Sequence, residues 1–278
     1  MNRSKWYISF ILILGIFLYI GSITITKAGV NKNNTTKTSI KIDKIALKQL
    51  EMRDTTVSVR TRIGSGSGII INCFTTDIDE TFEYIVLTNA HITNSRFMII
   101  LLKVNSLTGV IETKKIDTGC NITAFDHTNL NLFHYDAVVI AEDKQYDFAL
   151  LSFRAQYKFA VAKIADEDML NKVRVFDEVF AIGCQLGRGP IPTTGIISQI
   201  ITGKNNEKEW TIYGNTAQIT PGSSGGGLFK KYDEHYYMIG IPFRVVVAGN
   251  GQIIPHLARA ISVGVAKDFI NQNMVSRQ

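Results

Sequence analysis

The sequence predicts an all-β protein made of two six-stranded antiparallel β-barrels, with a transmembrane helix near the N-terminus and a short helix at the C-terminus. Short runs rich in Val, Ile, Phe, Tyr and Thr recur along most of the chain, separated by Gly, Asn and Asp. These runs form two series on either side of a polar connector at 154–177. The 278 residues are 45% hydrophobic and 19% charged, which indicates a globular body and excludes a disordered chain.

The two series place the barrels at about residues 50–155 and 175–265, within a folded domain that we expect at 41–278. The first series consists of 55–60, 67–73, 83–88, 97–104, 110–116, 135–141 and 148–153. The second consists of 178–183, 193–200, 209–213, 227–230, 236–242 and 259–263. Apolar residues at helical spacing predict a short helix from Ile42 to Leu50 and a terminal helix from Val265 to Met274.

The first 26 residues contain the predicted membrane segment. The run from Trp6 to Ile25 carries no charge, and as a helix it would cover about 30 Å, the thickness of the hydrocarbon core of a bilayer. The alternative is a cleaved secretory signal, with Arg3 and Lys5 as its positive region. We favour an uncleaved anchor, followed by a flexible polar stalk at 27–40. Both alternatives place the remaining chain outside the cytoplasm, as a single-pass membrane protein or a secreted one.

The net charge indicates no particular polyanionic partner. Lysine and arginine number 30 against 24 acidic residues, giving +6 and an isoelectric point of about 9.1. The excess is spread thinly along the chain rather than gathered into runs, so we expect no nucleic-acid binding.

Three widely spaced cysteines, Cys73, Cys120 and Cys184, form neither a disulfide framework nor a metal-binding motif. We expect mostly buried, unpaired thiols and no metal. A single Cys73–Cys120 or Cys120–Cys184 bridge remains an alternative, because the predicted compartment is oxidising and sequence does not fix pairing.

The most informative stretch for chemistry is Thr220–Leu228, in which two serines are closely flanked by glycines. A nucleophilic serine needs glycines beside it, because a carbonyl substrate must approach the main chain closely and amide groups must point at the developing oxyanion. The amides of Gly222 and Ser224 are the natural donors, and Ser223 lies between them in the same predicted oxyanion hole. The alternative is an ordinary Gly/Ser loop.

A serine nucleophile also needs a base and an orienting acid. Among five histidines, His91 stands at the end of an apolar strand, where its ring would face a cleft. Asp147 stands immediately before another apolar strand. A lone histidine or a strand-start aspartate is ordinarily structural, but here the first half of the chain supplies base and acid and the second supplies the nucleophile. The predicted site therefore lies between the two barrels.

Four stretches together resemble the trypsin-like (chymotrypsin-fold) serine peptidases, and most closely the HtrA/Deg type. They are Gly64–Ile70, Leu87–His91, Asp147–Leu151 and Pro221–Gly226, and the resemblance covers about residues 50–265.

The resemblance implies a role for each matching residue. It makes Ser224 the nucleophile, His91 the general base and then acid, and Asp147 the residue that orients His91. The pattern Gly-x-Ser-Gly-Gly selects Ser224 over Ser223. It also implies the chymotrypsin-like fold, a protein or peptide substrate, and no cofactor.

The sequence departs from the family's pattern at several points. Gly227 stands where the family usually has proline, and Ser223 stands where digestive enzymes have the aspartate that pairs with a freed amino terminus. We therefore expect no activation by that route. We also expect no PDZ domain, because no sequence remains for one after residue 278. The long interval between His91 and Asp147 predicts an inserted hairpin or loop at about 105–134.

Substrate-binding residues are predicted by position. Gln218 and the segment Phe243, Arg244 and Val245 should line the primary pocket and the edge strand that pairs with substrate backbone. No acid is evident at the pocket base, so we expect small or medium apolar P1 side chains.

The sequence thus predicts a membrane-tethered serine endopeptidase that acts through an acyl-enzyme. A catalytically silent, protease-shaped binding module at the membrane is the alternative, and a processing enzyme with one cognate target is a further possibility. The substrate and the oligomeric state do not follow from the sequence.

Overall fold

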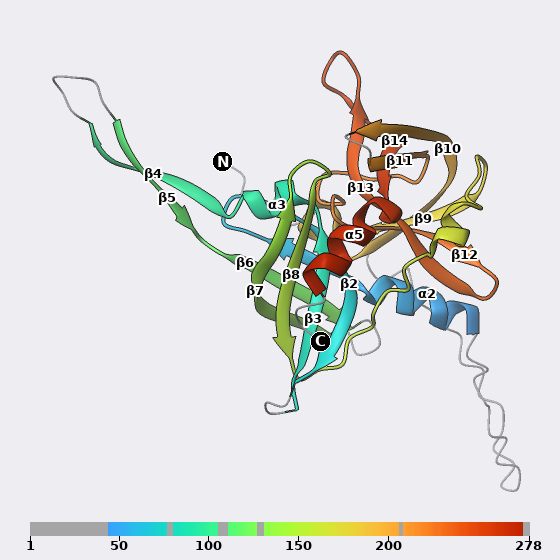
Figure 1. Cartoon of the computed structure of the whole chain (residues 1–278), viewed down its shortest axis with the longest axis horizontal. Coiled ribbons are helices and arrows are strands. Elements are labelled where there is room, and N and C mark those ends of the chain that lie inside the picture. Colours follow the sequence, from blue (N-terminus) through green and yellow to red (C-terminus); the bar gives the residue numbers. More distant parts are fainter. Residues whose placement is uncertain (1–43, 77–79, 105–110, 127–130, 206–207, 275–278) are drawn as a thin grey trace, which may run out of the picture. The chain divides into compact units, whose positions relative to one another are not determined.

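The computed structural model describes residues 44–274 apart from 77–79, 105–110, 127–130 and 206–207 (Figure 1). The predicted membrane segment and stalk lie outside the described residues. Within the part that is described, no helix is both long and apolar enough to cross a membrane.

The first barrel is a closed antiparallel sheet of six strands in the order β1-β2-β3-β8-β7-β6. Its strands are β1 (Thr56–Arg60), β2 (Ser65–Thr75), β3 (Phe82–Thr88), β6 (Cys120–Asp126), β7 (Asn131–Asp143) and β8 (Phe148–Ala155). Strand β3 pairs with β8 from Phe82↔Ala155 to Thr88↔Ala149. This register brings the end of β3, just before His91, beside the start of β8, just after Asp147.

Two strands predicted for the first barrel lie outside it. Within the described residues, β4 (Phe97–Val104) and β5 (Ile111–Asp117) pair only with each other, as a separate ribbon that extends away from the barrel (Figure 1). Their place in the barrel is taken by β6, which falls inside the predicted insertion at 105–134. That insertion is therefore smaller and lies earlier than predicted. The short β6 sequence, CNITAFD, lacks the strong β-branched pattern by which the other strands were predicted.

The second barrel is also closed, with six strands in the order β10-β11-β14-β13-β12-β9, and it confirms the second series. Its strands are β9 (Glu178–Gly183), β10 (Ile191–Asn205), β11 (Lys208–Asn215), β12 (Gly227–Tyr232), β13 (His235–Val247) and β14 (Ile253–Ser262). The Thr220–Gly226 segment is the connection that leads into β12. The predicted all-β architecture with two six-stranded barrels is therefore observed, although the strand pattern gave seven runs for the first barrel.

Short helices join and close the sheets. They are α2 (Lys44–Asp54), α3 (Ala90–Asn94), α4 (Glu167–Leu170), the 3₁₀ turn η1 (Gln185–Gly187) and α5 (Val263–Met274). The predicted helix at 42–50 corresponds to α2, which continues to Asp54. The predicted terminal helix is confirmed as α5.

One hydrophobic cluster joins the two barrels. It contains Leu87 and Leu150 from the first barrel, Ile182 and Ile241 from the second, and Phe269 from α5. The Phe269 ring stacks on Phe148, with centroids 6.2 Å apart. Two further clusters fill the interiors of the individual barrels. Because the shared cluster is continuous, the segments that meet between the barrels are held in fixed positions.

The cysteines are three free thiols, as predicted, with Cys120 and Cys184 buried and Cys73 half-buried. Burial raises the pKa of Cys120 to about 11 and that of Cys184 to about 12. Both thiols are therefore neutral near pH 7 and poorly nucleophilic.

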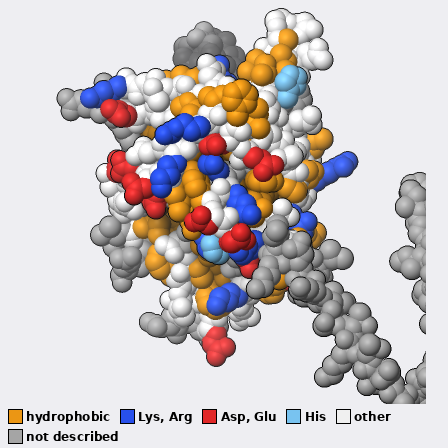
Figure 2. All heavy atoms as spheres, turned by 90° about the vertical axis from the view of Figure 1, so that its right-hand side faces the viewer, with side chains coloured by type: hydrophobic (Ala, Val, Ile, Leu, Met, Phe, Trp, Pro, Cys, Tyr) orange, Lys and Arg blue, Asp and Glu red, His pale blue; other side chains and the backbone are white. Residues whose placement is uncertain are grey.

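Surface charge is mixed. On the face shown in Figure 2, lysine and arginine side chains are interspersed with aspartate and glutamate, and apolar side chains lie between them. The basic excess is not gathered into one patch on that face.

We predict that Phe269→Ala lowers the free energy of unfolding by about 3–5 kcal/mol, because it removes a buried aromatic ring from the cluster that joins the barrels. Urea unfolding followed by tryptophan fluorescence measures this change. The control is Asn271→Ala on the exposed side of the same helix, expected to change stability by less than about 0.5 kcal/mol. Equal stability of the two variants would show that α5 does not stabilise the junction.

Candidate active site

Asp147 occupies a strained turn between β7 and β8. Its φ is +60°, in the left-handed region that costs a non-glycine residue about 1–2 kcal/mol. The preceding turn is held by Asp143, whose Oδ1 accepts hydrogen bonds from the backbone N–H groups of Gln145 and Tyr146. Strain of this kind persists only where surrounding contacts fix it, and it is concentrated at functional sites.

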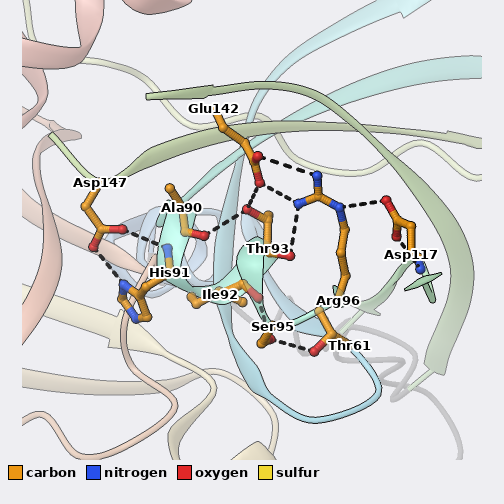
Figure 3. Close-up of polar contacts among 11 residues, drawn as sticks. Thr61, Ala90, His91, Ile92, Thr93, Ser95, Arg96, Asp117, Glu142 and Asp147 are labelled. Carbon is orange, nitrogen blue, oxygen red and sulfur yellow. Dashed lines mark hydrogen bonds and ion pairs between the residues drawn. The ribbon is translucent and has the colours of Figure 1, made fainter. Parts of the chain in front are cut away.

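Those fixing contacts come from the segment that carries His91 (Figure 3). The Asp147 carbonyl accepts hydrogen bonds from the Ala90 amide at 3.1 Å and from Asn89 Nδ2 at 2.9 Å. Its carboxylate accepts from the His91 amide at 2.8 Å through Oδ1 and lies 2.7 Å from His91 Nδ1 through Oδ2. Asp147 therefore fixes both the backbone and the ring of His91.

The contact with Asp147 also determines which ring nitrogen of His91 is available. An ionised carboxylate can only accept, so His91 Nδ1 carries the hydrogen and Nε2 keeps its lone pair. The His91 side chain is 50% exposed, and that of Asp147 is 31% exposed. This is the arrangement that a general base needs: an oriented ring with an accessible basic nitrogen.

A buried ion-pair network holds the short helix α3 on its other side (Figure 3). Glu142 on β7 accepts a hydrogen bond from the Thr93 hydroxyl and pairs with Arg96. Arg96, only 8% exposed, also donates to the Thr93 carbonyl at 3.0 Å and to Asp117 at 3.0 Å. The network thus ties α3, which carries His91, to the barrel wall and to the base of the β4–β5 ribbon.

Neighbouring charges keep Glu142 ionised. Burial alone would raise the pKa of Glu142, but hydrogen bonds from Arg96 and Thr93 and the charge of Arg96 hold that pKa below its ordinary value. The sequence analysis did not identify Arg96 or Glu142, because neither lies in a recognisable motif.

The segment before Ser224 has the features of a type II β-turn. The Ser223 amide donates to the Thr220 carbonyl at 3.0 Å, proline occupies the second position, and Gly222 in the third has φ = +96°. A Cβ on Gly222 would lie 2.6 Å from the Cys184 carbonyl, so only glycine fits. Because the Ser223 amide is used inside the turn, it is not a donor for the oxyanion hole predicted from the sequence.

The other two predicted donors are free. The Pro221 carbonyl accepts from the Leu186 amide at 2.9 Å, and the Ser223 carbonyl accepts from the Gly226 amide at 3.0 Å. In a trans peptide the C=O and N–H groups point in opposite directions, so the amides of Gly222 and Ser224 point away from these partners. No acceptor for either amide is found within the described part of the chain.

Ser224 itself lies where the two barrels meet. Its carbonyl accepts from the Ser67 amide of β2 at 2.8 Å. Gly225, next in the chain, is packed so closely that a Cβ would lie 2.3 Å from Thr88 Oγ1 and 3.1 Å from the Asn89 amide, two to three residues before His91. Among the described residues, no hydrogen bond joins the Ser224 hydroxyl to His91. Catalytic hydrogen bonds are often long without substrate and shorten when substrate binds.

The predicted substrate-binding residues occupy two places in the second barrel. Gln218 is exposed, and its carbonyl accepts from the Thr193 hydroxyl at 2.8 Å. Phe243, Arg244 and Val245 lie on β13 beyond the point where its pairing with β12 ends at Leu228↔Gly240. In the described chain that edge of β13 has no strand partner, so it is open to an extended peptide. Among the residues that the structure describes, no hydrogen bond joins Gln218 to these three residues.

The described residues form no metal-binding site. Across the described residues, no group of three or more His, Cys, Asp or Glu side chains is arranged to hold an ion.

Comparison with known proteins matches residues 66–241, more than half of the chain, to the family described as trypsin-like peptidase domain. The periplasmic pH-dependent serine endoprotease DegQ of Escherichia coli K12 is 30% identical over 191 residues, which cover 68% of this chain and 33% of DegQ. The periplasmic serine endoprotease DegP of Salmonella typhimurium is 32% identical over 139 residues, covering 50% of this chain and 28% of DegP. The chain thus spans about a third of the length of these relatives.

Among solved structures, an inactive serine-to-alanine mutant of Rv3671c from Mycobacterium tuberculosis H37Rv is similar in fold. The TM-score is 0.55 at 15% sequence identity, and the similarity covers 86% of this chain and 94% of that one.

We predict that Glu142→Gln lowers the free energy of unfolding at pH 7 by about 1.5–3 kcal/mol, because a charge-assisted hydrogen bond to the buried Arg96 is lost. A lowered carboxyl pKa contributes stability that is present above the ordinary value of 4.5 and is lost as pH falls through the lowered value. The difference from wild type should therefore shrink between pH 5 and pH 3, as measured by urea unfolding at each pH.

The control for this experiment is Glu178→Gln, which neutralises an exposed glutamate at the start of β9. Its stability should follow that of wild type at every pH. A Glu142→Gln deficit that stayed constant down to pH 3 would contradict a stabilising charge at Glu142.

Proposed function

The chain belongs to the trypsin-like peptidase family, and we propose that it is a serine endopeptidase with Ser224 as nucleophile, His91 as general base and acid, and Asp147 as the residue that orients His91. The observation that carries this proposal is the double contact of Asp147 with the amide and the ring of His91. A carboxylate in that position fixes the ring and its tautomer, which is the function of the acid in a serine peptidase.

In the proposed reaction, the Ser224 hydroxyl attacks the carbonyl carbon of the scissile peptide bond while His91 Nε2 takes its proton. Asp147 stabilises the imidazolium that forms. His91 then gives the proton to the leaving amine, so the peptide bond breaks and an acyl-enzyme remains. The same nitrogen then deprotonates a water molecule, which hydrolyses the ester, and His91 returns the proton to the Ser224 oxygen.

The amides of Gly222 and Ser224 are the proposed oxyanion donors. Their orientation, with the carbonyl of each peptide held on the opposite side, supports this role. Donors that are already positioned need no reorganisation when negative charge develops, and each such donor contributes about 10²–10³ in turnover.

Substrates are proposed to be extended protein or peptide segments. Backbone pairing with the open edge of β13 at Phe243–Val245 would hold the residues before the scissile bond, as β-strand addition does elsewhere. The relatives DegQ and DegP are periplasmic serine endoproteases, and this supports action on proteins outside the cytoplasm. Tethering by the apolar run at 6–25 is part of the proposal, with secretion after cleavage as its alternative.

We predict that Ser224→Ala abolishes labelling by a fluorophosphonate probe and lowers peptide hydrolysis to background, because it removes the proposed nucleophile. Gel fluorescence after labelling measures the first effect. Ser223→Ala is the matched control, since it removes the neighbouring hydroxyl but keeps the proposed nucleophile, and it should still be labelled. Labelling that survives Ser224→Ala but not Ser223→Ala would reassign the nucleophile, and an unlabelled wild type would favour the silent binding module.

We predict a preference for small or medium apolar P1 residues, because the uncharged Gln218 supplies no carboxylate to bind a basic side chain. Peptides that differ only at P1, from Ala and Val to Leu, Lys and Arg, test this through kcat/KM. A lysine or arginine preference of tenfold or more would contradict it.

A further inference from the structure

Ser67 is a fully buried serine in β2 of the first barrel. Its side chain contacts the nucleophile loop, Thr220–Gly226, which belongs to the second barrel. Its hydroxyl donates to the Gly222 carbonyl at 2.6 Å and accepts from the Cys184 amide at 2.7 Å. Its own amide donates to the Ser224 carbonyl at 2.8 Å. One residue of the first barrel therefore holds both sides of the turn that carries the proposed oxyanion donors.

These contacts determine the orientation of the peptides around the oxyanion donors. The Gly222–Ser223 peptide is held at its oxygen by Ser67 and at its N–H by the Thr220 carbonyl. Rotation of this peptide would break both bonds at once. Because the carbonyls of Gly222 and Ser224 are both fixed by Ser67, the intervening Ser224 amide is confined between them.

The Ser67 hydroxyl is closely surrounded by β9 and the turn. A Cβ on Gly183, at the end of β9, would lie 3.0 Å from Ser67 Oγ and 2.8 Å from Ser223 Cα. The hydroxyl is thus enclosed between β9 and the turn. Without it, the buried Cys184 amide would lose its acceptor and the Gly222 carbonyl would lose a donor, a situation that favours local rearrangement.

We propose that Ser67 is a positioning residue that holds the Gly222–Ser224 turn in the conformation that binds the oxyanion. This inference rests on the proposed function. Ser67 touches neither the substrate nor the reacting atoms; it acts through the turn. Its loss should therefore weaken stabilisation of the tetrahedral intermediate while leaving substrate binding along β13 intact.

The matched control is available one strand away. Ser58 on β1 lies directly opposite Ser67 in the β1–β2 ladder, it is 1% exposed, and its hydroxyl has no hydrogen-bond partner among the residues described. Ser58→Ala and Ser67→Ala therefore delete the same buried atom from neighbouring positions, and only the second deletion removes contacts with the turn.

We predict that Ser67→Ala lowers kcat by 10- to 100-fold with KM within about twofold of wild type, whereas Ser58→Ala leaves both unchanged. Affinity for a peptide aldehyde, which forms a tetrahedral adduct with the nucleophile, should fall in parallel with kcat. Affinity for the corresponding peptide alcohol, which forms no adduct, should stay constant. The pH profile of kcat/KM should keep its shape, since the contact between His91 and Asp147 is not altered.

Ser67→Cys keeps the experiment decisive if the alanine variant does not fold. A thiol is a weaker donor and acceptor than a hydroxyl, so kcat should fall by an intermediate factor. Wild-type kcat in either Ser67 variant would overturn the inference, and so would equal losses of affinity for aldehyde and alcohol. An inactive wild type would instead overturn the proposed function, and this inference with it.

Discussion

The geometry of this site depends on a single residue in an unfavourable backbone conformation. Asp147 has positive φ, and four hydrogen bonds from the Asn89–His91 segment to its carbonyl and carboxylate fix it there. The same bonds determine where the His91 ring points. The hydrogen bonds that hold Asp147 in its strained conformation are therefore the same ones that orient His91. On its far side, that segment is held by Glu142 and Arg96.

The proposed nucleophile belongs to the other barrel, so the site also requires that the barrels be fixed against each other. The hydrophobic cluster that crosses between them provides the non-directional part of this attachment. Directional contacts through Ser67 and Gly225 set the final position of the loop. Apolar packing alone would tolerate small displacements, whereas hydrogen bonds to specified carbonyls do not. Positioning of the loop therefore requires both kinds of contact.

Most of the fold could be predicted from sequence because it is encoded locally. The run of β3 is apolar and β-branched, that of β8 is mostly apolar and aromatic, and glycines mark the nucleophile loop. Strand β6 was missed because its seven residues mix polar and apolar types, and its burial comes from two neighbouring strands. Ser67 lay at the start of a predicted strand and within a stretch that resembles the family, but nothing there indicated its bonding partners, which are 117 and 155 residues away. Contacts of that range leave no local pattern.

The β4–β5 ribbon pairs with no other strand in the described chain, and it exposes Ile99 and Leu102 to solvent at 70% and 57%. A two-stranded ribbon has little stability of its own. At its base, the buried guanidinium of Arg96 attaches it to the barrel wall through Glu142. The ribbon is therefore an appendage whose sequence and length could change while His91, a few positions away along the chain, stays held by the barrel.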